Sequence, residues 1–457
     1  SAPVAVDKGS ILAYAEILQA DADVEELEWI ADTSAKPVLS PPSPEMRAQI
    51  EREAVIGSKD PKVRKQYIDL LCKYHQAISQ HSFDFGRFKY ARHNIRTKNE
   101  NPVHVKQFPL PYAHRPAITA HMEKLLKAGV ISQCKDSQYN TPFFCIKKKD
   151  GVSLRVLQDL RKLNENSVED RYIFSDVQSC IDAVGQSKAK VFSILDVTAG
   201  YYHLQLSEES KPKTAFTLPN NMWLKNKKGK LVTGRFLFDL LSMGLHGSGS
   251  SFSKIMAYVV RDIEALFGYM DDLFLYCLDD KHMLSVLELV LERLVRYNIK
   301  ISLTKARLGM SSVQYLGHEF GARGVQPASS NVQALIDIPP PRTVAQLRSF
   351  CGVANFFRQY VSNYASVAAH LTRLTRKFSR WSGGILPPNA FKAFKNLKAA
   401  IGKRPVLRYP RFDLPFEVHV DAAAGDQKDA PGGLGCILVQ RDGLGHPHPV
   451  IFASRSL

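Results

Sequence analysis

The sequence "LFGYMDDLFLYCLDD" at residues 266–280 places two adjacent carboxylates, Asp271 and Asp272, in an otherwise apolar run. Such a run is typical of buried strands, and it predicts two strands joined by a turn at residues 270–272. A carboxylate that leaves water without a partner destabilises a fold, and two adjacent carboxylates repel each other. A bound cation would offset both effects, so this stretch indicates a metal site.

A third aspartate, Asp196, ends another predicted strand in "VFSILDVTAGYYHLQL", residues 191–206. Carboxylate oxygens from separate strands suit Mg²⁺. Two such ions, about 3.5–4 Å apart, activate an attacking hydroxyl and stabilise the leaving oxygen in nucleotidyl transfer. Taken alone, Asp196 is better explained as a turn cap, because Asp is common in turns. The paired aspartates in an apolar hairpin are harder to explain in that way.

The whole chain is basic. Its length suffices for roughly three domains, and 61 Lys and Arg against 44 Asp and Glu give a net charge of +17. The first 80 residues hold 13 acidic and 9 basic residues, a net −4, which leaves +21 for the remainder. This excess favours an extended polyanion such as nucleic acid as the partner. A solvated basic surface is the alternative.

The cysteines and the hydropathy pattern exclude several classes of protein. Seven cysteines are scattered without a CxxC pair, so neither a disulfide framework nor a zinc site is predicted, and a reducing compartment fits. No apolar stretch approaches the ~18 residues that span a bilayer, so we expect no membrane partner. The motif "DTSA" at residues 32–35 faintly matches an aspartic protease signature, but its flanks are helical and acidic, which disfavours a protease.

Hydrophobic periodicity and turn residues divide the chain into helical and strand segments. The expected elements, in chain order, are a helix at 11–30, a Pro-rich linker at 34–46, a helical stretch at 44–56, a hairpin at 141–157 that turns at 150–151, helices at 242–267 and 279–300, a hinge at 339–341, a helical block at 343–378 and three strands at 416–425, 432–440 and 449–457. Strands interspersed with helices indicate an α+β fold.

Six motifs in one order carry a resemblance to a known family. They are "IKKKDG" with "RVLQDLRKLN", "SILDVTAGYYHLQL", "KTAFTLP", "YMDD", "YLGHEF" and "LRSFCGVANFFRQYV". From residue 83 onwards, the chain thereby resembles reverse transcriptase, in the pol protein of gypsy-type LTR retrotransposons and, more distantly, of retroviruses. The resemblance implies an α+β right-hand polymerase with fingers, palm and helical thumb, then a connection and the start of a ribonuclease H-like sheet. A mostly helical N-terminal extension precedes it.

The resemblance also implies domain boundaries. They are 1–80 for the acidic N-terminal extension, 81–168 and 204–247 for the fingers, 169–203 and 248–323 for the palm, 324–380 for the thumb, 381–413 for the connection and 414–457 for the N-terminal part of the ribonuclease H domain.

The implied activity is an RNA- and DNA-templated DNA polymerase that uses two Mg²⁺ ions and deoxynucleoside triphosphates. Asp196 and Asp271 match its metal-bridging carboxylates. Asp272 matches a supporting acid that faces partly away, because adjacent strand side chains point to opposite faces. Tyr201 matches the steric gate that excludes a ribose 2′-hydroxyl, and its alternative is a core aromatic.

Three residues match contacts to the incoming nucleotide. Lys148 and Arg155 match fingers residues that close on the triphosphate, since Arg makes forked phosphate contacts and Lys acts as a point charge. Lys148 alone also fits a solvated hairpin tip. Met243 is expected against the nascent base pair, although "SMG" stands where relatives usually have Pro-Phe-Gly or Pro-Gln-Gly.

Two further groups match nucleic-acid contacts. They are the primer grip at Tyr315, Leu316 and Gly317 and the thumb track at Gly352, Asn355 and Phe356. The thumb residues lie at i, i+3 and i+4, so they share one helix face. The alternatives are an ordinary hairpin for the first group and a helix-packing stripe for the second.

Asp421 in "VHVDAAAG" matches the first metal carboxylate of ribonuclease H. That nuclease needs further acids which this sequence lacks, so it is expected to be inactive in this chain. The runner-up function is a catalytically silent nucleic-acid-binding or assembly subunit of the same fold, and a nuclease is a weaker third. The implied partners are RNA/DNA and DNA/DNA template-primers, with a homodimer or a processed subunit left open, in cytoplasmic virus-like particles.

Overall fold

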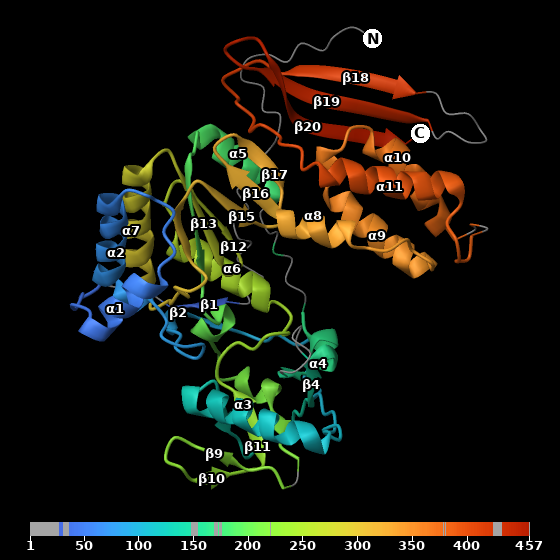
Figure 1. Ribbon diagram of the computed structural model, residues 1–457. Coiled ribbons are helices and arrows are strands. Elements are labelled where there is room, and N and C mark those ends of the chain that lie inside the picture. The colour runs from blue at the N-terminus through green and yellow to red at the C-terminus, as the bar shows by residue number, and fades with distance from the viewer. Residues whose placement is uncertain are drawn as a thin grey trace. The chain divides into compact units, whose positions relative to one another are not determined.

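The computed structural model describes residues 27–30, 36–147, 154–168, 172, 176–219, 221–377, 379, 381–423 and 432–456. The chain divides into two compact units (Figure 1). Unit 1 comprises the described residues within 1–31, 90–172 and 204–251, and unit 2 comprises those within 32–89, 173–203 and 252–457. Among the described residues, no helix is both long and apolar enough to cross a bilayer.

A four-stranded antiparallel sheet of order β12-β13-β6-β14 forms the centre of unit 2. Its strands are β12 (Leu266–Tyr269), β13 (Asp272–Cys277), β6 (Val191–Asp196) and β14 (Arg307–Met310). After Asp272, every residue of β13 is buried, as a continuous apolar run predicts for a central strand. The hairpin expected at residues 266–280 and the strand expected to end at Asp196 are both confirmed.

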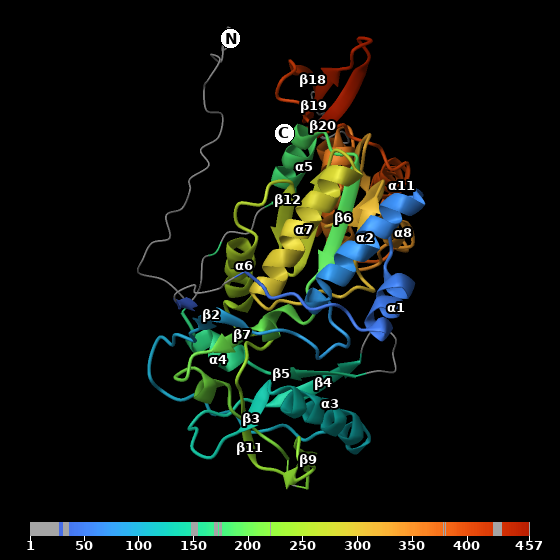
Figure 2. The same ribbon diagram turned by 90° about the vertical axis from the view of Figure 1, so that its left-hand side faces the viewer.

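Helix α7 (Asp280–Arg296) packs on β13 and β6 (Figure 2). Its apolar residues recur with helical spacing and form a buried stripe, the pattern that a core-facing helix requires. Asp279 accepts a hydrogen bond from the His282 N–H at 2.8 Å, which satisfies a donor that the first turn leaves free. The helix expected at residues 279–300 is therefore confirmed.

Two N-terminal helices, α1 (Pro44–Glu53) and α2 (Pro61–Lys73), belong to unit 2 as well. Helix α2 lies beside α7 (Figures 1 and 2). Tyr67 of α2 is fully buried and donates its hydroxyl hydrogen to Asp280 at 2.8 Å. Residues 36–80 of the expected extension are therefore packed into this unit, whereas residues 27–30 belong to unit 1.

The helix expected at residues 11–30 is wrong at its end. Leu27–Trp29 form strand β1, which pairs antiparallel with β2 (Phe88–His93). Leu27 is buried and the next two residues are exposed. Pairing with β2 gives these residues backbone partners, and such tertiary context overrides a local helical pattern. Residues 11–26 lie outside the described residues.

Unit 1 consists of short strands and helices. They are β3 (Ile131–Gln133), β4 (Phe143–Lys147), β5 (Leu154–Gln158), β7 (Leu204–Leu206), β8 (Phe216–Thr217), β9 (Leu224–Lys225), β10 (Leu231–Val232), β11 (Arg235–Phe238), α3 (Arg115–Ala128) and α4 (Arg161–Asn166). Strands β4 and β5 pair antiparallel, which confirms the expected hairpin. Its turn, residues 148–153, lies outside the described residues.

Helix α6 (Ser248–Val259) is shorter than the helix expected at residues 242–267. Asp262 and Ala265 have φ values of 64° and 59°. This left-handed conformation cannot continue a right-handed helix. The chain instead enters β12 at Leu266, so the second half of that prediction is wrong.

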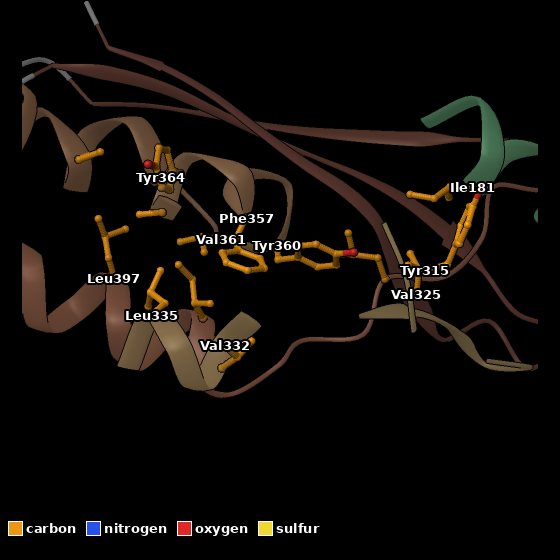
Figure 3. Close-up of a cluster of buried hydrophobic side chains, with 14 of the residues drawn as sticks. Ile181, Tyr315, Val325, Val332, Leu335, Phe357, Tyr360, Val361, Tyr364 and Leu397 are labelled. Atoms are coloured by element: carbon orange, nitrogen blue, oxygen red, sulfur yellow. The ribbon is translucent and has the colours of Figure 1, made fainter. Parts of the chain in front are cut away.

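A second sheet and four helices complete the middle of unit 2. They are β15 (Ser312–Tyr315), β16 (His318–Gly321), β17 (Gly324–Pro327), α8 (Ser329–Ile336), α9 (Val344–Phe356), α10 (Tyr364–Thr372) and α11 (Pro388–Gly402). Their buried side chains form one apolar cluster with those of α5 (Val177–Ser187) (Figure 3). Thr343 and Gln346 form a capping box that starts α9. The helical block expected after the hinge is confirmed.

The three C-terminal strands expected from the sequence are present as an antiparallel sheet. They are β18 (Glu417–Ala423), β19 (Gly433–Arg441) and β20 (Pro447–Ser456). The sheet packs on α10, whose Ala365 N–H donates to Ser454 Oγ at 2.9 Å. Two glycines of β19 leave room for this close approach, since a Cβ on Gly433 or Gly435 would overlap α10 or Asn363 just before it.

Candidate active site

Strand pairing brings the predicted carboxylates together at one end of the central sheet. Asp272 is the register partner of Asp196 across β13 and β6. Directly opposed residues of an antiparallel pair have Cβ atoms about 4.5–5.5 Å apart and share a face. Asp271 lies in the turn before β13, and its carbonyl accepts a hydrogen bond from the Val197 N–H at 2.8 Å. Asp272 therefore lies opposite Asp196 on the neighbouring strand, while Asp271 lies in the turn at the end of these strands.

Burial and mutual repulsion shift the acidity of this group. Burial raises the pKa of Asp272 to about 6, with the charges of Asp271 and Asp196 adding to the rise. Burial and the charge of Asp196 also raise the pKa of Asp271, partly offset by a backbone hydrogen bond and by Lys305. Each shift means that the anionic form is short of positive charge. A bound cation would supply it.

Lys305 is a site residue that sequence reasoning missed. Its Nζ lies 2.8 and 3.1 Å from the two carboxylate oxygens of Asp196. The Ser302 N–H donates to the Asp196 carbonyl at 2.9 Å, so the segment that carries Lys305 is tied to the end of β6. One ammonium against three carboxylates leaves the site acidic.

The donor set fits Mg²⁺ only as an open site. Within the part of the chain that the structure describes, no three acidic, His or Cys side chains enclose a metal ion. Mg²⁺ usually takes one or two protein carboxylates and completes its octahedron with water and phosphates. Asp196 and Asp271 on neighbouring backbone segments meet that need.

Tyr201 lies beside the carboxylates on the 3₁₀ turn Gly200–His203. Its ring packs against Phe252, with centroids 5.9 Å apart, and burial and the charge of Asp271 raise the pKa of its hydroxyl. Gly200 makes this possible, since a Cβ there would lie 2.8 Å from the Phe252 ring and 3.4 Å from Asp271 Cβ. The half-buried ring is therefore held next to the carboxylates and is not part of the fully buried core.

A buried histidine anchors this turn. His203 Nε2 accepts a hydrogen bond from the Lys300 N–H at 3.1 Å, so its proton must be on Nδ1, which lies 3.1 Å from the Gly200 carbonyl and donates to it. Burial lowers the pKa of His203 to about 4. The ring thus stays neutral near pH 7 and fixes the Tyr201 turn with both nitrogens.

The predicted primer grip is a tight hairpin. Leu316 and Gly317, with φ values of 47° and 82°, form the two-residue turn between β15 and β16, as a type I′ turn requires. Tyr315 is buried, stacks on Phe274 at 4.8 Å and donates its hydroxyl hydrogen to the Asp272 carbonyl at 3.4 Å. Its side chain therefore supports the carboxylate strand, and only the turn is left to contact a ligand.

The predicted thumb residues lie on the solvent side of α9. Gly352, Asn355 and Phe356 are exposed, so the helix-packing alternative is wrong. The Phe356 ring lies 4.9 Å from the His318 ring, and a Cβ on Gly317 would lie 2.7 Å from it. The structure thus brings the end of the thumb face against the primer-grip turn.

The predicted nucleotide contacts belong to unit 1, whereas the carboxylates belong to unit 2. Arg155 is exposed on β5. Met243 is 49% exposed and lies in a loop that is hydrogen-bonded to Asn164. The Asn164 Nδ2 donates to the Gly244 carbonyl at 2.8 Å, and its Oδ1 accepts from the His246 N–H at 2.9 Å. Lys148 lies outside the described residues.

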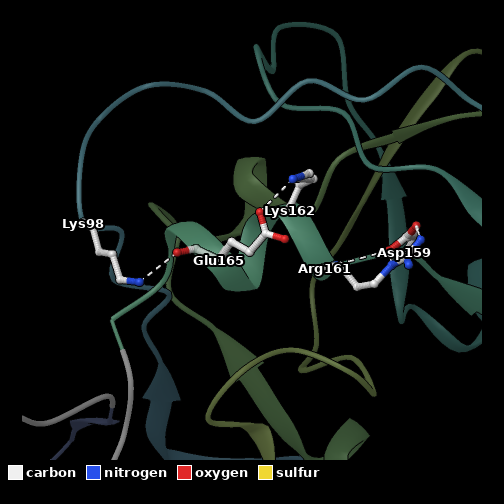
Figure 4. Close-up of polar contacts among 5 residues, drawn as sticks. All are labelled: Lys98, Asp159, Arg161, Lys162 and Glu165. Carbon is white, nitrogen blue, oxygen red and sulfur yellow. Dashed lines mark hydrogen bonds and ion pairs between the residues drawn. The ribbon is translucent and has the colours of Figure 1, made fainter.

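Ion pairs hold the short helix α4 that carries Asn164 (Figure 4). Arg161 pairs with Asp159 at 2.7 Å and Lys162 with Glu165 at 2.8 Å. Lys98 also donates to the Glu165 carbonyl at 2.8 Å. These contacts fix the helix from which Asn164 orients the Met243 loop.

Asp421 lies exposed on β18, opposite Gly435. No described acid joins it in a metal-binding group. Its match to a ribonuclease H carboxylate therefore stays a prediction.

Two family models match the chain. Residues 146–320 match "Reverse transcriptase (RNA-dependent DNA polymerase)", and residues 387–457 match "RNase H-like domain found in reverse transcriptase". The chain is 29% identical over 378 residues to the Pol polyprotein of transposon opus and 26% over 413 residues to that of transposon gypsy, both from Drosophila melanogaster. These matches cover 79% and 86% of this chain but 35% and 37% of the relatives, so the chain spans about a third of their length.

Solved structures share the fold. The foamy viral protease-reverse transcriptase in complex with double-stranded DNA has a TM-score of 0.76 at 21% identity, over 92% of this chain and 70% of that one. The same viral protein with an RNA/DNA hybrid has a TM-score of 0.72 at 21% identity, over 93% and 53%.

The family match over residues 146–320 and the carboxylate hairpin within it together define a reverse transcriptase. Among these enzymes, the chain belongs with the Pol reverse transcriptases of gypsy-type LTR retrotransposons, as the sequence resemblance predicted. Enzymes of this class generally depend on divalent metal ions.

Proposed function

We propose that this chain extends a primer on RNA and DNA templates with deoxynucleoside triphosphates, by two-metal nucleotidyl transfer. The observation that carries the proposal is the convergence of Asp196, Asp271 and Asp272 at one end of the central sheet. The complexes of the foamy viral enzyme with double-stranded DNA and an RNA/DNA hybrid support the choice of template-primers.

Asp196 and Asp271 would hold two Mg²⁺ ions, which activate the primer 3′-hydroxyl and stabilise the leaving phosphate oxygen when bound. Asp272 would act as the supporting acid, the role that the resemblance implies, and burial and the two neighbouring carboxylates raise its pKa. Lys305 holds Asp196 in place and balances part of the negative charge.

Tyr201 would act as the steric gate beneath the incoming sugar. Its ring cannot retreat easily, because Phe252 packs against it and Gly200 and His203 fix its turn. A ring held in this way can exclude a 2′-hydroxyl by contact alone. Rejection is then a difference in kcat/KM between the two kinds of nucleotide.

The remaining predicted contacts complete the proposal. Lys148 and Arg155 would bind the triphosphate, and Met243 would touch the nascent base pair. The half-buried Leu316–Gly317 turn would hold the primer end.

The exposed face of α9 would follow the duplex. Gly352 has nothing within 4 Å of the position of a Cβ, so a backbone phosphate or sugar can approach the helix there. Asn355 and Phe356 would flank that contact.

The proposal does not include ribonuclease H. Asp421 stands without a second acid among the described residues, and two ions need several carboxylates. A silent subunit is the alternative function, but it gives no reason for three carboxylates and a fixed tyrosine at one place. A homodimer or processed partner and a location in cytoplasmic virus-like particles belong to the proposal through the motif resemblance alone.

Primer extension tests the proposed function. The chain should extend a labelled primer on matched RNA and DNA templates in Mg²⁺, and EDTA should stop it. A folded chain that binds template-primer but adds no nucleotide on either template would favour the silent subunit.

A further inference from the structure

We propose that unit 2 carries a second nucleic-acid site, a basic pocket that binds backbone phosphates of a single strand. The pocket has a volume of about 600 Å³, which lies in the usual range for ligand sites. Its cationic lining consists of Lys188, Lys190, Arg323, Arg408 and Arg411. None of the described residues that line it is acidic.

The basic pocket is separate from the carboxylate site. Lys190 directly precedes β6, and Asp196 is the last residue of that strand. A strand rises about 3.3 Å per residue, so roughly 20 Å of chain divides Lys190 from Asp196. A strand in the basic pocket is therefore not the nucleotide at the carboxylates.

Two of the five cations form ion pairs with acidic residues. Arg411 pairs with Asp413 at 2.5 Å, and Arg408 lies 4.0 Å from Asp442. Asp442 also pairs with His448, which lines the pocket, at 2.9 Å. These arginines are oriented, and their charge is partly balanced.

The other three cations supply the excess charge. Lys188, Lys190 and Arg323 are exposed. No ion pair joins any of them to a described residue, although the charge of Lys188 helps to lower the pKa of Asp413. They come from two separate turns, one after α5 and one between β16 and β17. The pocket therefore has a local surplus of positive charge that the protein does not neutralise.

The walls of the basic pocket are rigid. Tyr409 stacks on Phe320 at 6.5 Å, and its hydroxyl accepts a hydrogen bond from the Gly321 N–H at 3.2 Å. Helix α5 fits closely against the same segment, because a Cβ on Gly185 would lie 2.6 Å from the Pro410 carbonyl oxygen. A preformed site avoids part of the entropic cost of binding.

This arrangement favours a strand over a compact anion. The cations come from three chain segments, and one phosphate group can contact only those nearest to it. Successive phosphates of a strand can meet Lys190, Arg323 and the arginines of residues 406–411 at once. Arg also suits the forked contact that a phosphodiester accepts. The proposal goes beyond primer extension, because binding here requires no catalysis.

The test measures binding while the polymerase cleft is filled. An excess of unlabelled hairpin template-primer occupies the cleft, and the anisotropy of a labelled single strand of about 12 nucleotides reports the second site. The pocket variant is Lys190→Gln/Arg323→Gln. Its matched control is Lys62→Gln/Lys65→Gln, which removes the same charge from the exposed side of α2.

Each lost phosphate contact should reduce the slope of log K against log[salt] by about 0.7 for a single strand. The pocket variant should therefore have a slope shallower by about 1.4 and at least tenfold weaker binding at low salt, with the control unchanged. Equal slopes and affinities in both variants would overturn the proposal. Displacement of the strand by inorganic tripolyphosphate at equal phosphate concentration would overturn the choice of a strand as the ligand.

Primer extension in the same samples keeps this test apart from the proposed function. All three proteins should extend primers at similar rates, which also shows that the variants fold. Suppose that the wild-type chain does not extend primers, and that the pocket variant binds the single strand more weakly than the wild type does. This pair of results would refute the proposed polymerase function and still support the basic pocket.

Discussion

Lys305 Nζ contacts both carboxylate oxygens of Asp196, at 2.8 and 3.1 Å. One flexible lysine from the segment before β14 thus neutralises the acid that ends β6. Asp271 and Asp272 still have raised pKa values, so the protein's own charges leave the site short of positive charge. The carboxylate hairpin is therefore a site that bound metal ions would complete.

Lys305→Gln should move the acidic limb of the pH–rate profile for primer extension to higher pH. Lys305 lowers the pKa of Asp271 and Asp272, so without it both acids ionise only at higher pH. Since the anionic forms bind the cation, the variant should be most impaired at pH 6 and least at pH 8.5. Lys281→Gln, an exposed change on α7, is the control, and superimposable acidic limbs would contradict the prediction.

Asp272→Asn should stabilise the metal-free protein at pH 7.5. A carboxyl whose folded pKa is about 6, above its usual value of 3.8, binds its proton more tightly in the folded chain. Stability therefore falls as pH rises through this window. Because the carboxyl is partly exposed, solvent screens its charge, and we expect the free energy of unfolding of the variant at pH 7.5 to rise by only about 1 kcal/mol. This corresponds to a Tm increase of ~2 °C.

The measurement is thermal unfolding in EDTA at pH 4 and pH 7.5. The gain should vanish at pH 4, where the carboxyl is protonated in the folded protein. Asp136→Asn, an exposed acid of unit 1, controls for the change of side chain. A gain of equal size at both pH values would mean that charge is not its cause.

Tyr201→Ala should raise the use of ribonucleotides relative to deoxynucleotides on the order of 100-fold in kcat/KM, because the variant no longer blocks a 2′-hydroxyl. Tyr201→Phe keeps the ring and should discriminate as the wild type does. Single-nucleotide extension with matched ribo- and deoxynucleotides measures both ratios. Discrimination that survives loss of the ring would return Tyr201 to a purely structural role.

Gly317→Ala and Gly352→Ala should have opposite effects on stability. Ala at the Gly317 φ of 82° is strained by about 1–2 kcal/mol, and its Cβ would meet Phe356 at 2.7 Å. At Gly352 a Cβ meets nothing, and Ala favours the helix by about 0.5–1 kcal/mol.

Both glycine variants should nevertheless bind template-primer more weakly, because each alters a backbone surface assigned to nucleic acid. Thermal unfolding and the rate of template-primer dissociation separate the two effects. Tight binding by a stabilised Gly352→Ala variant would remove that face of α9 from the interface.

The carboxylate hairpin was predictable because its signal is local. Two acids inside a buried apolar run repel each other, and this unfavourable pattern can be recognised from residues 266–280 alone. The strand, turn and strand follow from the same short stretch. The motif order then identified the family without any contact information.

The supporting contacts were not predictable, because they join distant segments. Lys305 is 109 residues from Asp196, and His203 meets Lys300 across 97 residues. Neither residue has a local pattern that separates it from an ordinary surface lysine or core histidine. The β1 strand escaped prediction for the same reason, since its pairing with β2 outweighs its own helical periodicity.

The central claim is that Asp271 binds catalytic metal in a polymerase, and primer extension by Asp271→Asn tests it most directly. A neutral amide is a poor replacement for an anionic Mg²⁺ ligand. Extension should therefore fall at least 1,000-fold, about 4 kcal/mol in the barrier, while circular dichroism and template-primer binding stay as in the wild type. Asp279→Asn, where Asn caps α7 as well as Asp does, should remain active. Near-normal extension by a folded Asp271→Asn chain would contradict the account.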